Sequence, residues 1–349
     1  MMDLSKDDRS YLSIIYKGGW IVVGMVPRRL QPGDEVRVIS PSRSMAILKE
    51  KQVDIARNRL EALGFHVTFG KHVHTHDEFF STSIEERIED LHTAFLDQNV
   101  KGIFTAIGGY NVNQLLKYID FNIIKNNPKV IIGYSDITAL SVSIYQKTGL
   151  VTYSGPHFSS FGMKHGFEYT MDSFIQAVTN DAPYEVTPSE LWSDDPWYLD
   201  QEDRHFHEQK EYLVLQEGNA EGTLIGGNLC TLNLLHGTEF MPSLKGSILF
   251  IEDDHESHAL TFDRDLQSVL HLPGAEDIQA ILIGRFQKDS QVTEEALRKI
   301  ISSKREISYI PVIANVNFGH VSPIATIPVG GKATIEAKQE SCFIQIEQS

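Results

Sequence analysis

The sequence predicts an α/β protein with an N-terminal parallel-sheet domain, followed by a C-terminal α/β domain that ends in antiparallel strands. Three observations predict this fold class. Short β-rich runs alternate with helical windows from residue 34 onward, which is typical of crossover units in a parallel sheet. The same alternation resumes after residue 222. The tail, residues 326–346, alternates apolar and polar residues as antiparallel strands do.

A length of 349 residues exceeds what one hydrophobic core usually supports and favours two domains. The character of the chain changes over residues 166–221, which carry three prolines and an acidic stretch with Trp192 and Trp197. We therefore expect four segments, namely an extension at 1–26, an N-terminal α/β domain at 27–165, a linker and long tryptophan-bearing loop at 166–221, and a C-terminal domain at 222–349.

The individual elements follow from periodicity and from helix start and stop signals. Gly64 ends the first helical window, and Ser83-Ile84-Glu85-Glu86 predicts a capped start for the second. In the first domain we expect a strand at 34–40, a helix at 45–63, a strand at 67–69, a helix at 83–99 and a strand at 102–107. In the second we expect helices at 229–236, 263–272 and 293–302, and strands at 247–251, 280–283 and 312–315.

Composition narrows the classes of partner. The net formal charge of −16 repels a phosphate backbone, so we expect a small-molecule partner and no nucleic acid. Cys230 and Cys342 lie far apart, which argues against a disulfide framework or a zinc site. The apolar patch at residues 21–25 is too short to span a bilayer, and the start lacks a signal-peptide pattern. We expect a cytoplasmic protein that does not contact a membrane.

Ser135 stands where a buried strand, residues 129–132, turns through Gly133 into a helix that begins at Ile137. This pattern is typical of a nucleophile elbow, which exposes a side-chain oxygen at the end of a sheet. The next backbone N–H is then aimed at the reacting carbonyl. Ile137 occupies the place of the second glycine of an ordinary α/β-hydrolase motif. A serine or aspartate that merely caps the helix explains the same residues at least as well.

A serine nucleophile needs a base, and the base needs an orienting carboxylate. His320 lies in a glycine-containing loop after the last β-rich run, from which a histidine can reach across a cleft. Glu252 ends the apolar strand at 248–251, where a carboxylate is well placed to meet that histidine. Three nearby acids compete for the same role, namely Asp253, Asp254 and Glu256.

Two glycine pairs follow predicted strands. Gly108-Gly109 can supply an oxyanion-binding N–H, because glycine lets a ligand approach the backbone closely, or can be a simple turn. Gly226-Gly227-Asn228 opens a helix and is either a turn or an anion-binding helix start. Neither pair has the Gly-x-Gly-x-x-Gly spacing of a dinucleotide fingerprint.

Two groups of histidines alternate along the chain as metal ligands sometimes do, namely His72, His74 and His76 in one group and His205 and His207 in the other. No additional ligand is marked out for either group, and an H-E-x-x-H helix is missing. We therefore expect no catalytic metal and no cofactor.

Eight short motifs, read together, show a family resemblance. They are Pro32-Gly33-Asp34, Ile39-Ser40-Pro41-Ser42, Ile107-Gly108-Gly109-Tyr110-Asn111, Gly133-Tyr134-Ser135-Asp136-Ile137-Thr138-Ala139-Leu140, Gly155-Pro156, Gly226-Gly227-Asn228-Leu229, Phe250-Ile251-Glu252-Asp253 and Phe318-Gly319-His320. In this order they resemble the LD-carboxypeptidase family of serine peptidases. The resemblance runs from Pro27 nearly to the C-terminus.

The resemblance implies a Ser-His-Glu triad in which Ser135 attacks, His320 moves the proton and Glu252 orients the imidazole. It also implies an oxyanion hole made by the backbone N–H groups of Gly109 and Asp136, and catalysis without a metal. Members of the family are similar in having two α/β domains with the active site between them, and usually form homodimers. We expect the same of this chain.

Within the family, three features favour the MccF-like branch, which hydrolyses the amide between an aspartyl group and a nucleotide in microcin C-type toxins. They are Ile107, Asn111 after the glycine pair, and the loop with Trp192 and Trp197. An aromatic ring can stack on a nucleobase, although tryptophan also packs at interfaces. We expect substrate contacts from Tyr110, Asn111, Trp192, Trp197 and Asn228.

Two alternatives stay open. One is a murein LD-carboxypeptidase that releases D-alanine from muropeptides. Against it, Asp254-His255 follows Glu252-Asp253 where murein enzymes tend to carry Val-Gly. The other is a protein that sequesters such a toxin without turning it over. Hydrolysis that depends on Ser135 separates the enzyme from the sequestering protein.

Overall fold

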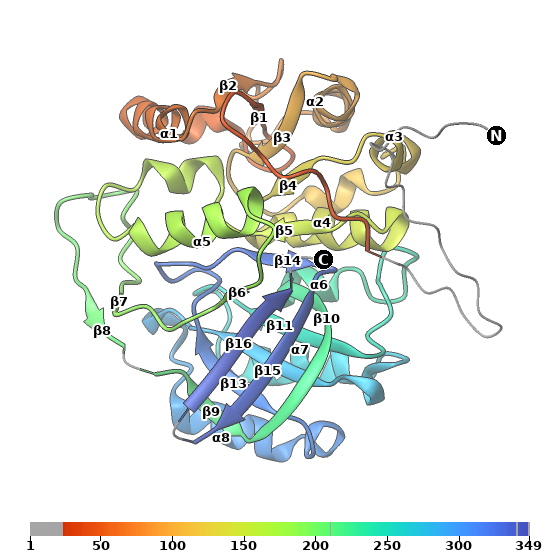
Figure 1. The fold of residues 1–349 in the computed structure, drawn as a ribbon, viewed down its shortest axis with the longest axis vertical. Helices are drawn as coiled ribbons and strands as arrows, with labels where there is room; N and C mark the ends of the chain where they lie inside the picture. The colour runs from red at the N-terminus through yellow and green to blue at the C-terminus, as the bar shows by residue number, and fades with distance from the viewer. Residues whose placement is uncertain (1–23, 210, 340, 348–349) are drawn as a thin grey trace.

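The computed structural model describes residues 24–209, 211–339 and 341–347 and shows two α/β halves, one above the other in Figure 1. The upper half is built on a six-stranded sheet and the lower half on an eight-stranded sheet. This arrangement confirms the predicted fold class, including the antiparallel strands near the C-terminus.

The first sheet is parallel except at one edge. Its strands, in spatial order, are β14 (Ile327–Val329), β5 (Thr152–Ser154), β4 (Val130–Ile132), β3 (Val100–Thr105), β1 (Glu35–Ile39) and β2 (His66–Phe69). Strand β14 comes from the far end of the chain and pairs with β5 in the antiparallel direction. The C-terminal part of the sequence therefore contributes a strand to the N-terminal sheet.

Five helices accompany this sheet, namely α1 (Glu50–Ala62), α2 (Ile84–Leu96), α3 (Phe121–Asn126), α4 (Thr138–Thr148) and α5 (Glu168–Thr179). The cap predicted at Ser83 is confirmed, because its side chain accepts a hydrogen bond from the Glu86 N–H. Helix α4 is buried along almost its whole length and ends at Gly149, which adopts a left-handed conformation. A buried helix at this place gives the turn before it a rigid support.

The second sheet has a parallel centre and antiparallel edges. Its strands, in spatial order, are β6 (Tyr184–Glu185), β16 (Ser341–Glu347), β15 (Lys332–Lys338), β10 (Gly218–Asn228), β11 (Ser247–Glu252), β12 (Ala280–Gly284), β13 (Val312–Val316) and β9 (Leu213–Gln216). The parallel pairs join β10 to β11, β11 to β12 and β12 to β13. Three helices belong to this half, namely α6 (Leu229–Asn233), α7 (Ala259–Leu270) and α8 (Glu294–Ser303).

The segment at 166–221, expected to be a linker and long loop, carries more regular structure than that description suggests. It contains helix α5, strands β6 and β9, the small pair β7 (Leu191–Trp192) and β8 (His207–Glu208), and the start of β10. Most of the extension expected at 1–26 lies outside the described residues. Within the described ranges, no helix is both long enough and apolar enough to cross a membrane.

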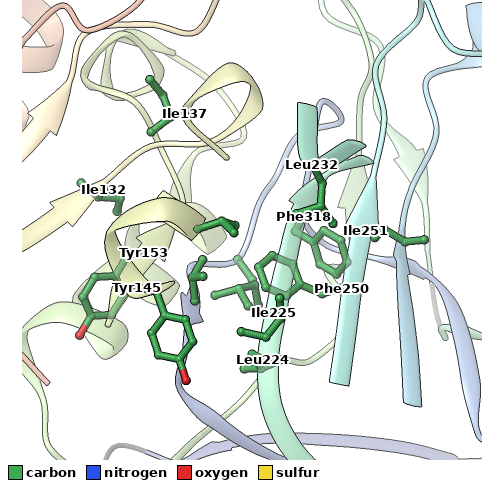
Figure 2. Close-up of a cluster of buried hydrophobic side chains, with 14 of the residues drawn as sticks. Ile132, Ile137, Tyr145, Tyr153, Leu224, Ile225, Leu232, Phe250, Ile251 and Phe318 are labelled. Atoms are coloured by element: carbon green, nitrogen blue, oxygen red, sulfur yellow. The ribbon is translucent and has the colours of Figure 1, made fainter. Parts of the chain in front are cut away.

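The two halves meet through buried side chains. Figure 2 shows Tyr145 of the first half beside Leu224 and Ile225 of the second, in one cluster of buried side chains that also includes Tyr153 and Phe250. Each large apolar side chain that leaves water contributes about 1.5–3 kcal/mol to folding. The cluster therefore favours one fixed placement of the halves.

The halves approach each other closely where β10 passes the start of α4. Gly227 has φ of +135°, and a Cβ atom there would lie 2.5 Å from Thr138 Oγ1. The next residue, Asn228, donates its backbone N–H to the same Thr138 oxygen at 2.9 Å. Only glycine fits at position 227 because it has no side chain and tolerates a positive φ.

We predict that Gly227→Ala lowers the free energy of unfolding by about 1–3 kcal/mol more than Gly237→Ala does, because only the first adds a methyl group against Thr138. Gly237 also has a positive φ, but a Cβ atom added there would meet nothing within 4 Å. Urea denaturation of both variants measures the difference. Equal losses would show that the Thr138 contact does not constrain the fold.

Candidate active site

Ser135 lies on the turn between β4 and α4, in a short 3-10 turn that spans Ser135–Ile137. Its φ is +61°, a left-handed conformation that a serine rarely adopts. Such a conformation persists only where the surroundings impose it. The strand before it and the helix after it are both buried, so the side chain is held at the end of the sheet as a nucleophile elbow requires.

The structure brings Glu252 and His320 to this serine. His320 Nε2 lies 3.0 Å from Ser135 Oγ, and His320 Nδ1 lies 2.7 Å from Glu252 Oε2. Glu252 is the last residue of β11, and His320 lies between β13 and β14. Glu256, one of the competing acids, instead accepts a hydrogen bond from the Tyr110 hydroxyl at 2.8 Å. Of the two glutamates, only Glu252 contacts the histidine.

Gly319 lets the histidine loop approach the carboxylate. It has φ of +103°, and a Cβ atom there would lie 2.6 Å from Glu252 Oε2. A side chain at this position would push the loop away from the glutamate. The motif Phe318-Gly319-His320 therefore has a steric reason for its glycine.

The electrostatics of the trio favour a charged imidazole. Burial by itself would lower the pKa of His320, but the charge of Glu252 and its hydrogen bond raise that pKa to about 8. Glu252 is 3% exposed, and its other oxygen, Oε1, has no hydrogen-bond partner in the described part of the chain. Burial, and then the neighbouring Glu252 charge, raise the pKa of Asp253 to about 7. Glu252 is thus held close to the histidine in a site with little water.

The backbone N–H groups of Gly109 and Asp136, which are expected to bind an oxyanion, lie on adjacent segments. Asp136 follows Ser135 directly, in the first turn of a helical segment, where backbone N–H groups have no partner within the helix. Its carboxylate accepts hydrogen bonds from Ser42 Oγ at 2.6 Å and from the Val112 N–H at 3.0 Å. This side chain ties the nucleophile turn to the loop that carries Gly109. The carboxylate is a contact that the sequence reasoning did not identify.

A second residue that sequence reasoning missed is His157, which directly follows the Gly155-Pro156 motif. It is 2% exposed, its ring stacks on Tyr134 with centroids 4.3 Å apart, and its Nδ1 lies 2.8 Å from Thr105 Oγ1. Burial, and then the nearby His320, lower its pKa to about 3. A neutral histidine therefore supports the residue that precedes the nucleophile, and it adds no positive charge beside His320.

Three of the residues expected to contact the substrate are Tyr110, Asn111 and Asn228. They differ in whether the side chain is exposed. Tyr110 is 62% exposed, and its hydrogen bond to Glu256 joins the two halves. The side chains of the other two are already engaged within the protein. Asn111 Oδ1 accepts from Arg87 at 3.0 Å, while Asn228 caps α6 and donates to Asp253 at 3.2 Å.

The two tryptophans of the long loop occupy different surroundings. Trp192 is followed by Ser193, whose backbone N–H and C=O pair with Ser322 at 2.8 and 2.9 Å. Ser322 is two residues after His320, so Trp192 lies next to the histidine loop. Trp197 is partly buried, and its ring packs edge-on against Tyr198 with centroids 6.2 Å apart.

Histidines from both groups with ligand-like spacing contact other side chains. His205 Nδ1 lies 3.6 Å from Asp195, and the ring of His207 lies beside that of Trp192 with centroids 4.8 Å apart. His72 lies 3.2 Å from Glu86 and 3.0 Å from Glu89, at the side of α2. Among the residues that the structure describes, no group of three or more His, Cys, Asp or Glu side chains is arranged to hold a metal ion.

Comparisons with known proteins identify the family. Residues 36–155 match the LD-carboxypeptidase N-terminal domain, and residues 221–335 match the LD-carboxypeptidase C-terminal domain. The chain belongs to the LD-carboxypeptidase family. The matched ranges contain Ser135, Glu252 and His320.

Three similar proteins align with nearly the whole of this LD-carboxypeptidase. YocD of Bacillus subtilis is 54% identical over 93% of this chain and 100% of its own. The crystal structure of an MccF-like protein from Bacillus anthracis has a TM-score of 0.91 at 52% identity, covering 93% of this chain and 99% of that one. The microcin C7 self-immunity protein MccF, solved in complex with aspartyl sulfamoyl adenosine, has a TM-score of 0.84 at 30% identity. The match covers 93% of this chain and 99% of the MccF chain.

We predict that the imidazole of His320 titrates with a pKa of about 8 and that Glu252→Gln lowers this pKa by about 1–3 pH units, because the variant removes the adjacent charge. NMR of the histidine ring measures both values. Glu256→Gln is the control. It removes an equal charge, but from a carboxylate that accepts a hydrogen bond from Tyr110 rather than from His320. A shift of similar size in both variants would contradict a specific pairing of Glu252 with His320.

Proposed function

We propose that this protein is a serine carboxypeptidase or amidase whose nucleophile is Ser135. The observation that carries the proposal is the continuous chain from Ser135 Oγ through His320 to Glu252, with distances of 3.0 and 2.7 Å. Both contacts fall within the range for a nucleophile, its base and the group that orients the base. A serine that merely capped a helix would need neither of these partners.

In this proposal, Ser135 Oγ attacks the scissile carbonyl while His320 Nε2 takes the hydroxyl proton. Glu252 accepts the Nδ1–H of the imidazole and stabilises the imidazolium. The negative oxygen of the tetrahedral intermediate binds the backbone N–H groups of Gly109 and Asp136. The C–N bond then breaks, and the leaving nitrogen takes the proton from His320. A water molecule, activated by the same histidine, hydrolyses the acyl-enzyme and restores Ser135.

For the substrate, we propose an aminoacyl group joined to a nucleotide moiety, as in microcin C-type toxins and their analogues. Support comes from the similar MccF structure that contains aspartyl sulfamoyl adenosine. We propose contacts to such a substrate from the exposed Tyr110 and from Trp192, which lies beside the histidine loop. An aromatic contact with a base contributes about 1–3 kcal/mol. Asn111, Asn228 and Trp197 remain further candidates for contacts.

A murein carboxypeptidase is the second candidate, and one observation favours it. The murein tetrapeptide carboxypeptidase of Pseudomonas aeruginosa is 26% identical over 88% of this chain. Both reactions cleave an amide by the same serine chemistry, so the triad does not separate them. A cytoplasmic location, expected from the composition and the start of the sequence, and a homodimer, implied by the family resemblance, complete the proposal.

We predict that the purified protein hydrolyses aspartyl sulfamoyl adenosine and that Ser135→Ala lowers the rate by about 10⁶-fold, because the nucleophile is lost. An L,D-muropeptide is assayed in parallel by chromatography of the products. Ser302→Ala, an exposed serine on α8, is the matched control and should be as active as the parent.

Cleavage of the muropeptide alone would assign the murein reaction. Tight binding of the adenylate without hydrolysis by the parent would instead identify a sequestering protein and contradict the proposed enzyme. Equal hydrolysis by the parent and Ser135→Ala would exclude Ser135 as the nucleophile.

We predict that kcat/KM rises as pH increases through about 8, because the pKa of His320 is about 8 and only the neutral imidazole accepts the serine proton. In Glu252→Gln the midpoint should move to lower pH, since the charge that raises the pKa is gone. The maximal rate should fall by about 10⁴-fold, because the imidazole loses its orienting partner. A pH–rate profile of both proteins measures this. A flat profile from about pH 6 to about pH 9 would contradict His320 as the base.

A further inference from the structure

Arg285 begins at the edge of the sheet where Glu252 lies. It follows Gly284, the last residue of β12, and its backbone N–H donates to the Val316 carbonyl at 3.3 Å. A Cβ atom on Gly284 would lie 2.7 Å from Glu252 Cβ. The strand that precedes Arg285 is therefore packed directly against the strand that ends in Glu252. Ligands of parallel sheets bind at this carboxyl edge.

The guanidinium of Arg285 lies on the ring of Trp192, with its central carbon 4.5 Å from the ring centroid. Its Nε is buried and has no hydrogen-bond partner. Burial lowers the pKa of Arg285 to about 10, so the group is still charged at neutral pH. In the described residues, no hydrogen bond or ion pair is formed by any of its side-chain nitrogens. A largely buried cation is costly unless an anion accompanies it.

A second cation lies at the same ring. Lys288 Nζ is 5.2 Å from the Trp192 centroid, contacts His207 Nε2 and lies 3.6 Å from Asp194. Asp194 is the carboxylate that pairs with Lys288. Lys288 therefore has a carboxylate partner, whereas no ion pair is formed by Arg285 within the described residues. In a chain with a net charge of −16, a cation without a carboxylate partner next to the candidate triad favours an anionic ligand.

The cluster of Arg285, Trp192 and Lys288 lies next to the candidate triad, on the side of His320. Trp192 precedes Ser193, which pairs with Ser322 in both directions, and Ser322 follows His320 by two residues. A substrate group that extends past His320 would therefore reach Arg285 next. His320 delivers the proton to the leaving nitrogen in the proposed reaction, so this is the leaving-group side of the scissile bond.

We propose that Arg285, held flat by Trp192 and accompanied by Lys288, binds an anionic oxygen group on the leaving part of the substrate. The assignment to the leaving part depends on the proposed function, whereas the anion site itself does not. A guanidinium presents parallel N–H donors that match a carboxylate or a phosphate. The anion has two possible sources, the phosphate-type group of a nucleotide and the terminal carboxylate of a peptide, and both have the chemistry that Arg285 recognises.

Binding measurements on the full chain test this proposal without requiring turnover. Isothermal titration compares adenosine monophosphate with adenosine, and N-acetyl-D-alanine with its amide. Within each pair, only the first probe carries the anionic group. The expected result is that the parent binds the charged member of at least one pair about tenfold or more tightly than the neutral member.

Variants then assign the preference to one side chain. Arg285→Gln should remove the preference and leave the affinity for the neutral probe unchanged. Arg285→Lys keeps the charge but not the planar donors and should retain part of the preference. Arg298→Gln is the matched control, because Arg298 lies on the surface of α8 and pairs with Glu294. Melting temperatures of all three variants verify folding.

The outcomes are distinct from those of the hydrolysis assay. A preference for adenosine monophosphate that Arg285→Gln abolishes identifies the nucleotide group as the source. A preference for N-acetyl-D-alanine that is lost in the same way identifies the terminal carboxylate. Equal binding of charged and neutral probes by the parent overturns the proposal. An undiminished preference in folded Arg285→Gln also overturns it, even where Ser135-dependent hydrolysis is found.

Discussion

The hydrogen bond from the Asn228 backbone N–H to Thr138 Oγ1, 2.9 Å long, is the contact on which the site geometry depends. Thr138 is the first residue of α4, and Ser135 precedes it by three positions. Asn228 is the register partner of Glu252 across the parallel pair of β10 and β11. A single short contact therefore relates the backbone of the nucleophile to the backbone of the carboxylate, and Gly227 makes that contact possible.

His320 is placed by a different device, because its loop is anchored in both sheets. The chain leaves the second sheet at the end of β13, passes His320, and enters the first sheet as β14 before it returns to β15. A loop that is anchored at both ends loses less conformational entropy when its histidine is aligned. The cost of burying Glu252 is offset by this fixed partner, which is also why the pKa of His320 rises to about 8.

The fold class could be predicted from local pattern, and the same kind of pattern marked Ser135, Glu252 and His320 as candidates, whereas their selection as a triad came from the family resemblance. A buried run that ends in Ser135, another that ends in Glu252, and a glycine-containing loop with His320 all mark the carboxyl edge of a sheet. Two features have no such local pattern, the Asp136 carboxylate that joins Ser42 to Val112 and the joining of β14 to the first sheet. Both depend on pairings between residues far apart in the chain.

The residues proposed to perform or support the chemistry and those proposed to contact the substrate differ in how firmly they are held. Glu252, Asp136 and His157 are nearly inaccessible and have neighbours on every side, so few substitutions preserve their geometry. Tyr110 is exposed, and Arg285 Nε has no hydrogen-bond partner within the described chain. Substitutions of such side chains are expected to leave the core undisturbed. On the proposed function, a protein of this family can therefore keep one reaction while its substrate changes through a few residues around the triad.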